Sequence, residues 1–241
     1  MKIRQTMAEN RSIFHFKQFA LAHGNPGLKI TTEACLFGAW SGKFPQQNTL
    51  DIGTGCGLLI GMLAQAFPTS HFTGIEIQAD VAELAQENMS ALAHPKIKIK
   101  TIALSDYQSI HDFIICNPPF FINHLKNSDT SKNQAMHSDT LSPEELAEGI
   151  RRNLKAEGKF TVLYPPVGMK KFEKTALENG LYLNEICEVK HQANHETLRV
   201  MAQGSFRKSE IKTETICIKE LDGTYSREFT NLLKPYYLIF D

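Results

Sequence analysis

The chain has 241 residues and a net charge of zero, because 26 lysines and arginines balance 26 aspartates and glutamates. This length can bury the core of one large α/β domain, and the charge balance excludes a protein that binds nucleic acid through overall basicity. The five cysteines are widely spaced and form no C-x-x-C pair, which excludes a disulfide framework and a zinc ribbon. Without a signal-peptide pattern or a long apolar run, we expect a soluble, cytoplasmic protein.

From residue 48 onward, predicted strands alternate with helical patterns. The first strands are expected at 49–52, 71–77, 96–102, 113–116 and 158–164. The helices between and after them are expected at 58–67, at 79–92, from Ser142 onward and at 169–179. Three later strands, 181–189, 197–206 and 214–221, have no helices between them, which favours antiparallel pairing, and a closing helix is expected at 225–236. The alternation predicts a largely parallel sheet covered on both faces, with ligands at the carboxyl ends of its strands.

A glycine-rich segment, D-I-G-T-G-C-G at 51–57, follows the first strand. Alternate glycines allow a sharp turn and a close approach to a ligand. The third glycine comes one residue too early for a dinucleotide fingerprint, which disfavours a dehydrogenase. Asp51 would repel a pyrophosphate but suits a cationic amino group, and Glu76 at the next strand end can accept both hydroxyls of a ribose. A ligand with an amino-acid end, a ribose end and no phosphate is S-adenosylmethionine.

The segment N-P-P-F at 117–120 ends the fourth strand. The side-chain oxygen of Asn117 and the carbonyl of Pro118 could accept the hydrogens of an exocyclic amine as positive charge develops on it. Proline restricts the backbone, and Phe120 could stack on a base turned out of its strand. A simple turn between strand and loop is the structural alternative. Together with the glycine segment, the pattern favours N-methylation of a planar amine.

These patterns are familiar. D-x-G-x-G-x-G, the acid of GIEI and N-P-P-F resemble class I S-adenosylmethionine-dependent amino-methyltransferases over residues 48–122. A narrower resemblance, to tRNA-Val (adenine-37-N6)-methyltransferases, extends over most of the chain. It is carried by residues 14–40, NPPFF, AMHSDTLSPEEL and residues 225–240. The resemblance implies a Rossmann-like α/β fold with a mostly parallel seven-stranded sheet and antiparallel C-terminal strands. It also implies an N-terminal cap over 1–47, a methyltransferase domain over 48–241, and transfer of a methyl group to N6 of an adenine in tRNA.

The resemblance also implies roles for individual residues. Thr32 and Glu33 would lie near the methionine end of the cofactor, within a cap formed by 29–40, and Glu33 replaces a more usual aspartate. Ala103 occupies the place where an acid usually reaches the adenine amine, so Asp106 is the nearest substitute. The implied cofactor residues are Thr32, Asp51, Gly53, Gly55, Gly57, Glu76, Ile77, Asp106 and Asn117. The implied catalytic block is Asn117, Pro118, Pro119 and Phe120.

Contacts with RNA would come from local cations, for which Lys17, Lys126 and Lys132 are the candidates. The aromatic residues Phe14, Phe16 and Phe19 are expected as core contacts of an N-terminal helix, although a base-stacking surface is an alternative.

His191 and His195 are four residues apart but have no convincing third ligand, so no metal is expected. The expected partner is tRNA. We expect the protein to be a monomer and not to associate with a membrane. Three alternatives stay open: the same chemistry on rRNA, on DNA or on a protein glutamine amide. A non-catalytic RNA-binding module is a further alternative, which the intact Asp51, Glu76 and Asn117 disfavour.

Overall fold

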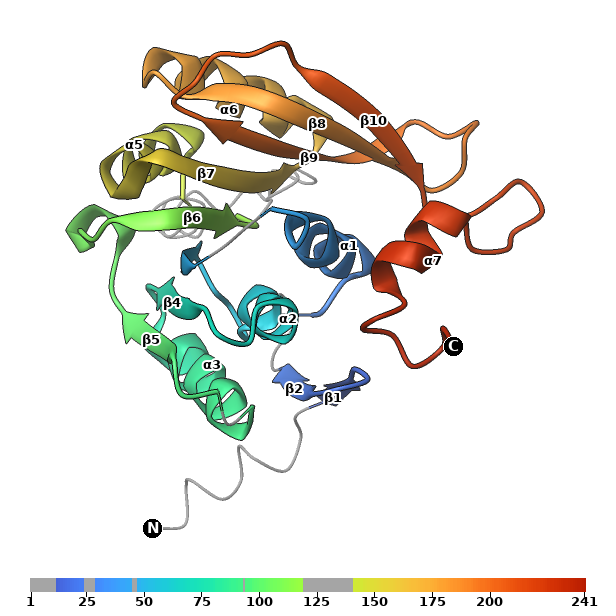
Figure 1. The fold of residues 1–241 in the computed structure, drawn as a ribbon, viewed down its shortest axis with the longest axis horizontal. Coiled ribbons are helices and arrows are strands. Elements are labelled where there is room, and N and C mark those ends of the chain that lie inside the picture. The colour runs from blue at the N-terminus through green and yellow to red at the C-terminus, as the bar shows by residue number, and fades with distance from the viewer. Residues whose placement is uncertain (1–11, 24–28, 45–46, 93, 119–140) are drawn as a thin grey trace, which may run out of the picture.

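The computed structural model describes residues 12–23, 29–44, 47–92, 94–118 and 141–241, and an eight-stranded sheet crosses this part of the chain (Figure 1). Its strands, in the order in which they lie side by side, are β10 (Lys212–Cys217), β8 (Tyr182–Lys190), β9 (Thr197–Ser205), β7 (Leu154–Tyr164), β6 (His111–Cys116), β3 (Asn48–Ile52), β4 (His71–Glu76) and β5 (Ile97–Thr101). The helices are α1 (Thr32–Ser41), α2 (Leu58–Ala66), α3 (Ala79–Ala91), the short 3-10 helix η2 (Leu104–Asp106), α5 (Pro143–Asn153), α6 (Pro166–Glu178) and α7 (Arg227–Leu233).

Strand direction confirms most of the predicted topology and corrects one part of it. Strands β5, β4, β3, β6 and β7 pair in parallel, and β9 is antiparallel to both β7 and β8. The expectation that all three late strands pair in antiparallel fashion is wrong for β10, which pairs with β8 in parallel. The link 206–211 passes the N-terminal end of β8, so β10 starts near the end of the sheet where β8 starts and runs in the same direction. The sheet has eight strands, where the family resemblance implied seven, and β10 corresponds to the strand expected at 214–221.

Two apolar layers enclose the sheet, because alternate residues of each strand face opposite sides. Phe113 and Ile115 of β6 belong to the core under α1, α2, α3 and α7, whereas Ile114 and Cys116 belong to the core under α5 and α6. The predicted start of α5 is confirmed, since the Ser142 hydroxyl accepts the Glu145 N–H at 3.1 Å and the Glu145 carboxylate accepts the Ser142 N–H at 2.9 Å. None of the described helices is long and apolar enough to cross a membrane.

The N-terminal aromatic residues lie in and beside a hairpin, β1 (Ser12–His15) and β2 (Ala20–His23), and the expected N-terminal helix is wrong. Phe14 and the buried Phe16 flank the exposed His15. This two-residue period is that of a strand. Phe16 stacks on Phe19 with ring centroids 4.4 Å apart, which confirms that the aromatic residues make core contacts.

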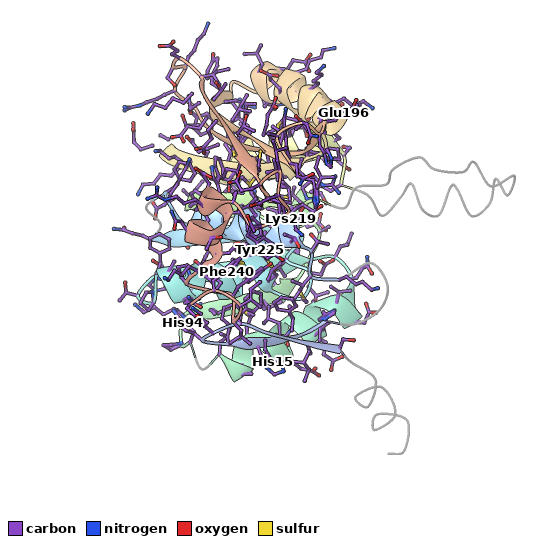
Figure 2. All side chains as sticks on the ribbon, turned by 90° about the vertical axis from the view of Figure 1, so that its right-hand side faces the viewer. His15, His94, Glu196, Lys219, Tyr225 and Phe240 are labelled. Carbon is purple, nitrogen blue, oxygen red and sulfur yellow. The ribbon has the colours of Figure 1, made fainter. Side chains whose placement is uncertain are left out.

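The C-terminal tail packs against this hairpin. The Lys17 N–H donates to the Tyr236 carbonyl at 2.8 Å, and the Lys17 ammonium donates to the Phe240 carbonyl. The Tyr237 ring lies 6.0 Å from the Phe14 ring, and Figure 2 shows Phe240 beside Tyr225, whose ring centroid is 5.3 Å away. The Lys17 side chain is therefore engaged within the chain, and its contact with RNA phosphate stays a prediction.

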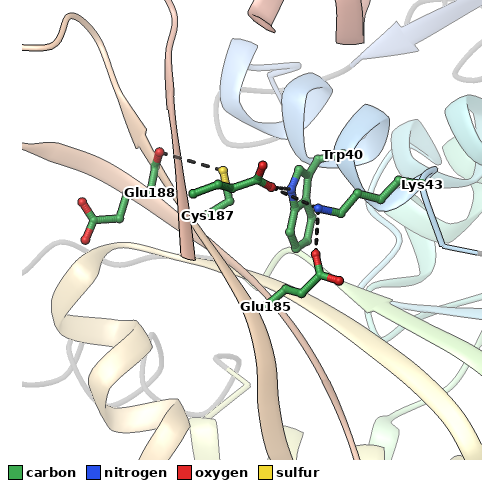
Figure 3. Close-up of polar contacts among 6 residues, drawn as sticks. Trp40, Lys43, Glu185, Cys187 and Glu188 are labelled. Atoms are coloured by element: carbon green, nitrogen blue, oxygen red, sulfur yellow. Dashed lines mark hydrogen bonds and ion pairs between the residues drawn. The ribbon is translucent and has the colours of Figure 1, made fainter. Parts of the chain in front are cut away.

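A polar clamp fastens the end of α1 to the outer strands β8 and β10 (Figure 3). Glu214 accepts the Trp40 indole N–H at 2.6 Å and pairs with the Lys43 ammonium at 3.0 Å. Lys43 also pairs with Glu185 at 2.9 Å, and its ammonium lies 4.3 Å from the Trp40 ring centroid. The clamp joins segments about 170 residues apart in the chain, and thereby fixes the helix whose other end faces the predicted site.

We expect Glu214→Gln to lower the free energy of unfolding by about 1 kcal/mol, because the amide keeps an acceptor for Trp40 but loses the charge that holds Lys43. Urea unfolding at low and high salt measures this change, which should shrink at high salt. Glu178→Gln is the matched control, since Glu178 pairs with Lys174 at 4.0 Å on an exposed helix face. An equal loss in both variants would contradict the clamp.

Candidate active site

Three strand ends meet at one edge of the sheet. Ile52 of β3 pairs with Ile75 of β4 on one side and with Cys116 of β6 on the other. The residues that follow these partners are Gly53, Glu76 and Asn117. Neighbouring strands lie about 4.8 Å apart. The predicted neighbourhood of the glycine segment and the N-P-P-F segment is therefore confirmed for the described residues.

The glycine segment forms a loop that needs glycine. Gly53, Gly55 and Gly57 all have positive φ angles, of 69°, 58° and 85°. A Cβ atom on Gly57 would lie 2.7 Å from the end of the Met89 side chain, whereas one on Gly53 would have no other atom within 4 Å. The loop is thus packed tightly against α3 at one end and open at the other, as a cradle for a ligand requires.

Asp51 lies under this loop with no exposed surface. One carboxylate oxygen accepts the Thr54 hydroxyl at 2.7 Å, and the other is buried without a hydrogen-bond partner among the described residues. Burial raises the pKa of Asp51 to about 7, the bond from Thr54 opposes this rise, and the nearby Glu76 adds to it. A buried acceptor without a partner is costly, and a cationic amino group would satisfy it.

Glu76 is held rigidly at the end of β4. One of its carboxylate oxygens accepts the Ile77 and Gln78 N–H groups at 2.9 and 3.1 Å, and the other accepts the Gly55 N–H at 3.2 Å. A carboxylate offers about four acceptor positions, so capacity remains for a ligand hydroxyl. Ile77 beside it is 54% exposed, which leaves an apolar surface next to the fixed carboxylate.

Asn117 carries the second acceptor without a partner at this edge. Its side-chain oxygen is buried and has no hydrogen-bond partner among the described residues, and the following Pro118 is buried. Pro119, Phe120, Lys126 and Lys132 lie outside the described residues. Two parts of the predicted catalytic block are thus described, and one of them presents a buried acceptor.

The remaining predicted cofactor residues lie on α1 and η2. Thr32 is exposed in the first turn of α1, whose N-cap Thr31 accepts the Ala34 N–H at 3.2 Å. Ala103 precedes η2, and Asp106 is exposed within it, accepting the Ser105 hydroxyl at 3.1 Å. Contacts of Thr32 and Asp106 with a cofactor therefore stay predictions.

Other groups that could carry chemistry have simpler roles. His191 and His195 stack on each other with centroids 5.5 Å apart, and no group of three metal ligands occurs among the residues described. All five cysteines are free, and burial raises the pKa of Cys56 in the glycine loop to about 11, so this thiol stays protonated near neutral pH.

The sequence analysis missed Thr54, which fixes one oxygen of Asp51. A hydroxyl three residues after a buried acid, between two glycines, was the available signal.

Comparison with known proteins identifies the chain. The model of the methyltransferase small domain family matches residues 35–164. A tRNA1(Val) (adenine(37)-N6)-methyltransferase from Pseudoalteromonas translucida is 33% identical, covering 93% of this chain and 98% of its own. The protein of the same name from Dyadobacter fermentans is 35% identical, covering 94% and 98%. This chain belongs to the tRNA1(Val) (adenine(37)-N6)-methyltransferase family.

Comparison with solved structures shows that the chain has the fold of known methyltransferases. A predicted O-methyltransferase from Agrobacterium tumefaciens matches with a TM-score of 0.61 at 14% identity, covering 83% of this chain and 94% of its own. A precorrin-6y C5,15-methyltransferase from Geobacter metallireducens matches with a TM-score of 0.55 at 13% identity, covering 79% and 94%. The fold is that of class I methyltransferases, and S-adenosylmethionine is the cofactor of the family. The buried acceptor on Asp51 and the open face of Gly53 fit this cofactor.

Proposed function

We propose that the protein methylates N6 of adenine 37 in valine tRNA. The observation that carries the proposal is the buried oxygen of Asn117 at the strand end beside the glycine loop, which has no hydrogen-bond partner within the described part of the chain. The substrate comes from the names of the two relatives, tRNA1(Val) (adenine(37)-N6)-methyltransferase, each of which is matched over 98% of its length.

The described residues have distinct roles in this proposal. S-adenosylmethionine supplies an electrophilic methyl group when bound. Asp51 holds its amino group, Glu76 holds its ribose, and Gly53, Gly55 and Gly57 let the backbone approach it. Ile77 packs on the adenine ring of the cofactor. Thr32 contacts the methionine end of the cofactor, and Asp106 contacts its adenine end.

Asn117 and Pro118 orient the substrate. The Asn117 oxygen and the Pro118 carbonyl accept the two hydrogens of the adenine amine, so the nitrogen lone pair turns toward the methyl group as charge develops. With the cofactor bound, the neutral amine would form the new N–C bond as the methyl–sulfur bond of the sulfonium breaks and leaves a thioether. The methylated nitrogen would then lose one proton to solvent, so no general base is required. Pro119 stiffens this corner, and Phe120 stacks on the base.

The substrate also sets the context of the protein. Lys17, Lys126 and Lys132 contact RNA phosphates, and binding therefore weakens steeply with salt. We also propose that the protein works in the cytoplasm, where its tRNA substrate occurs, and that it acts as a monomer and without a metal.

The test is methylation of unmodified valine tRNA by the purified protein, followed by mass spectrometry of nucleosides. We expect N6-methyladenosine in this tRNA and none in a transcript with guanine at position 37. Parallel reactions with rRNA, DNA and protein fractions distinguish the alternatives that share the chemistry. Methylation of rRNA, DNA or a protein glutamine instead of tRNA would contradict the proposed substrate, and absence of methylation in every fraction would contradict the activity.

A further inference from the structure

Asn88 of α3 is a buried polar residue in an otherwise apolar layer. The helix places it with Val81, Leu84 and Ala85 on the face toward the core, and only 5% of its surface is exposed. A buried amide must satisfy its hydrogen-bonding groups inside the protein. The partners of Asn88 therefore show what it holds together.

Asn88 bonds to two separate backbone segments. Its side-chain oxygen accepts the Ala22 N–H at 2.9 Å, and its side-chain nitrogen donates to the Ala22 carbonyl at 2.8 Å. The same nitrogen donates to the carbonyl of Cys56, also at 2.8 Å. Both N–H groups of the amide are thus used, one on strand β2 and one on the glycine loop.

One of these segments is part of the proposed cofactor site, and the other precedes the cap. Cys56 lies between Gly55 and Gly57, and β2 is the last strand before α1, which starts at Thr32. Figure 1 shows the hairpin beside α2 and α3, where Phe19 also packs on Gly61. One amide therefore fixes the distance between the cradle and the segment that leads into the cap.

We propose that Asn88 is a positioning residue, which holds the N-terminal hairpin and the glycine loop in the arrangement that binds S-adenosylmethionine. The proposal rests on the proposed function of the glycine loop. Because coupling between two parts is reciprocal, a cofactor held by the loop also steadies the hairpin. A purely structural asparagine would affect stability without affecting cofactor affinity at temperatures where the protein is folded.

The chain contains a matched control on the opposite face of the sheet. Asn153 has no exposed surface, and its side chain makes three bonds as well. It accepts the Ser109 N–H at 2.8 Å and donates to the Gly149 and Tyr107 carbonyls at 2.9 and 3.5 Å. None of these three residues belongs to the glycine loop or the hairpin, so Asn153→Ala removes comparable bonds without touching either of the two segments that Asn88 joins.

The test is calorimetric titration of Asn88→Ala and Asn153→Ala with S-adenosylmethionine, at a temperature where circular dichroism shows both to be folded. We expect the Kd to rise about tenfold or more in Asn88→Ala, within the usual range of coupling, and to stay within about threefold of wild type in Asn153→Ala. An unchanged Kd in Asn88→Ala, or an equal rise in both variants, would overturn the proposal.

Hydrogen exchange of the wild type tests the same coupling without a substitution, and decides the matter where a variant does not fold. Saturating S-adenosylmethionine should slow exchange of the Ala22 N–H at least about fivefold. It should leave unchanged the exchange of the Arg207 N–H, which bonds to the Ser205 hydroxyl at 3.1 Å beyond the end of β9. An exchange rate of the Ala22 N–H that is the same with and without the cofactor would overturn the proposed coupling. Wild-type protein that binds no S-adenosylmethionine would instead refute the proposed function, so the two failures are distinguishable.

Discussion

Asn117→Ala is expected to lower kcat for tRNA methylation by about 10²–10³, because it removes a fixed acceptor that acts on the charge developing in the transition state. The buried oxygen of Asn117 has no partner among the described residues, so its removal leaves no such group unpaired. The Kd for S-adenosylmethionine should change by less than about fivefold. Single-turnover kinetics with valine tRNA measures the chemical step separately from product release.

Asn48→Ala is the control for this substitution. Asn48 is at the opposite end of the sheet, where its side chain donates to the Ile110 carbonyl at 3.1 Å. We expect it to leave the single-turnover rate near the wild-type value. Full activity of the Asn117→Ala variant would show that the Asn117 side chain does not accept a hydrogen bond from the adenine amine in the transition state, even if the protein methylates tRNA.

Asp51→Asn is expected to weaken S-adenosylmethionine binding at least about a hundredfold, while making the cofactor-free protein more stable at alkaline pH. Losing one member of a buried charge pair typically costs about 3–5 kcal/mol, which accounts for the affinity. The gain in stability arises because burial raises the pKa of Asp51 from 3.8 to about 7. The charged carboxylate is therefore costly inside the folded protein.

The sign of the pH dependence follows from proton binding. Between about pH 4 and pH 7, the Asp51 carboxyl of the unfolded chain has released its proton and that of the folded chain retains it. The contribution of Asp51 to stability is therefore fully present below pH 4 and is lost as the pH rises to about 7. At 1.36 kcal/mol per pKa unit, the Asn variant should gain on the order of 4 kcal/mol relative to wild type over this range.

Urea unfolding of both proteins at pH 4 and pH 8 without cofactor measures this gain. Equal pH profiles would contradict the raised pKa. If Asp51 holds the amino group as proposed, we expect the wild-type affinity for S-adenosylmethionine to increase as the pH rises through about 7, because a cationic amino group favours the ionised carboxylate. The Asn variant should lack this pH dependence in calorimetric titrations.

The parts of the site that are contiguous in sequence could be predicted without a structure. Asp51 lies near the end of one strand, Gly53 and Asn117 each follow a strand, and the strand ends of a parallel sheet meet at one edge. The hairpin could have been predicted from the two-residue period of Phe14 and Phe16, but the expectation of a helix prevailed.

Contacts between distant segments carry no such signal. The clamp between Lys43 and Glu214 spans 171 positions, and nothing local marks either residue. The direction of β10 depends on which edge the link 206–211 reaches, which the sequence pattern does not specify. In the sequence, Asn88 is only a polar residue on an apolar helix face. Its partners Ala22 and Cys56 are set by tertiary packing, which the local sequence does not indicate.

The seating of the N-terminal hairpin on the C-terminal tail has a consequence for synthesis of the protein. The Lys17 N–H bonds to Tyr236, and the hairpin rings pack on Tyr237. A chain still emerging from the ribosome has completed the glycine loop long before it reaches these residues. The hairpin therefore gains its final support only after residues 236–240 have been translated, and shortening the tail should loosen a segment made more than 200 residues earlier.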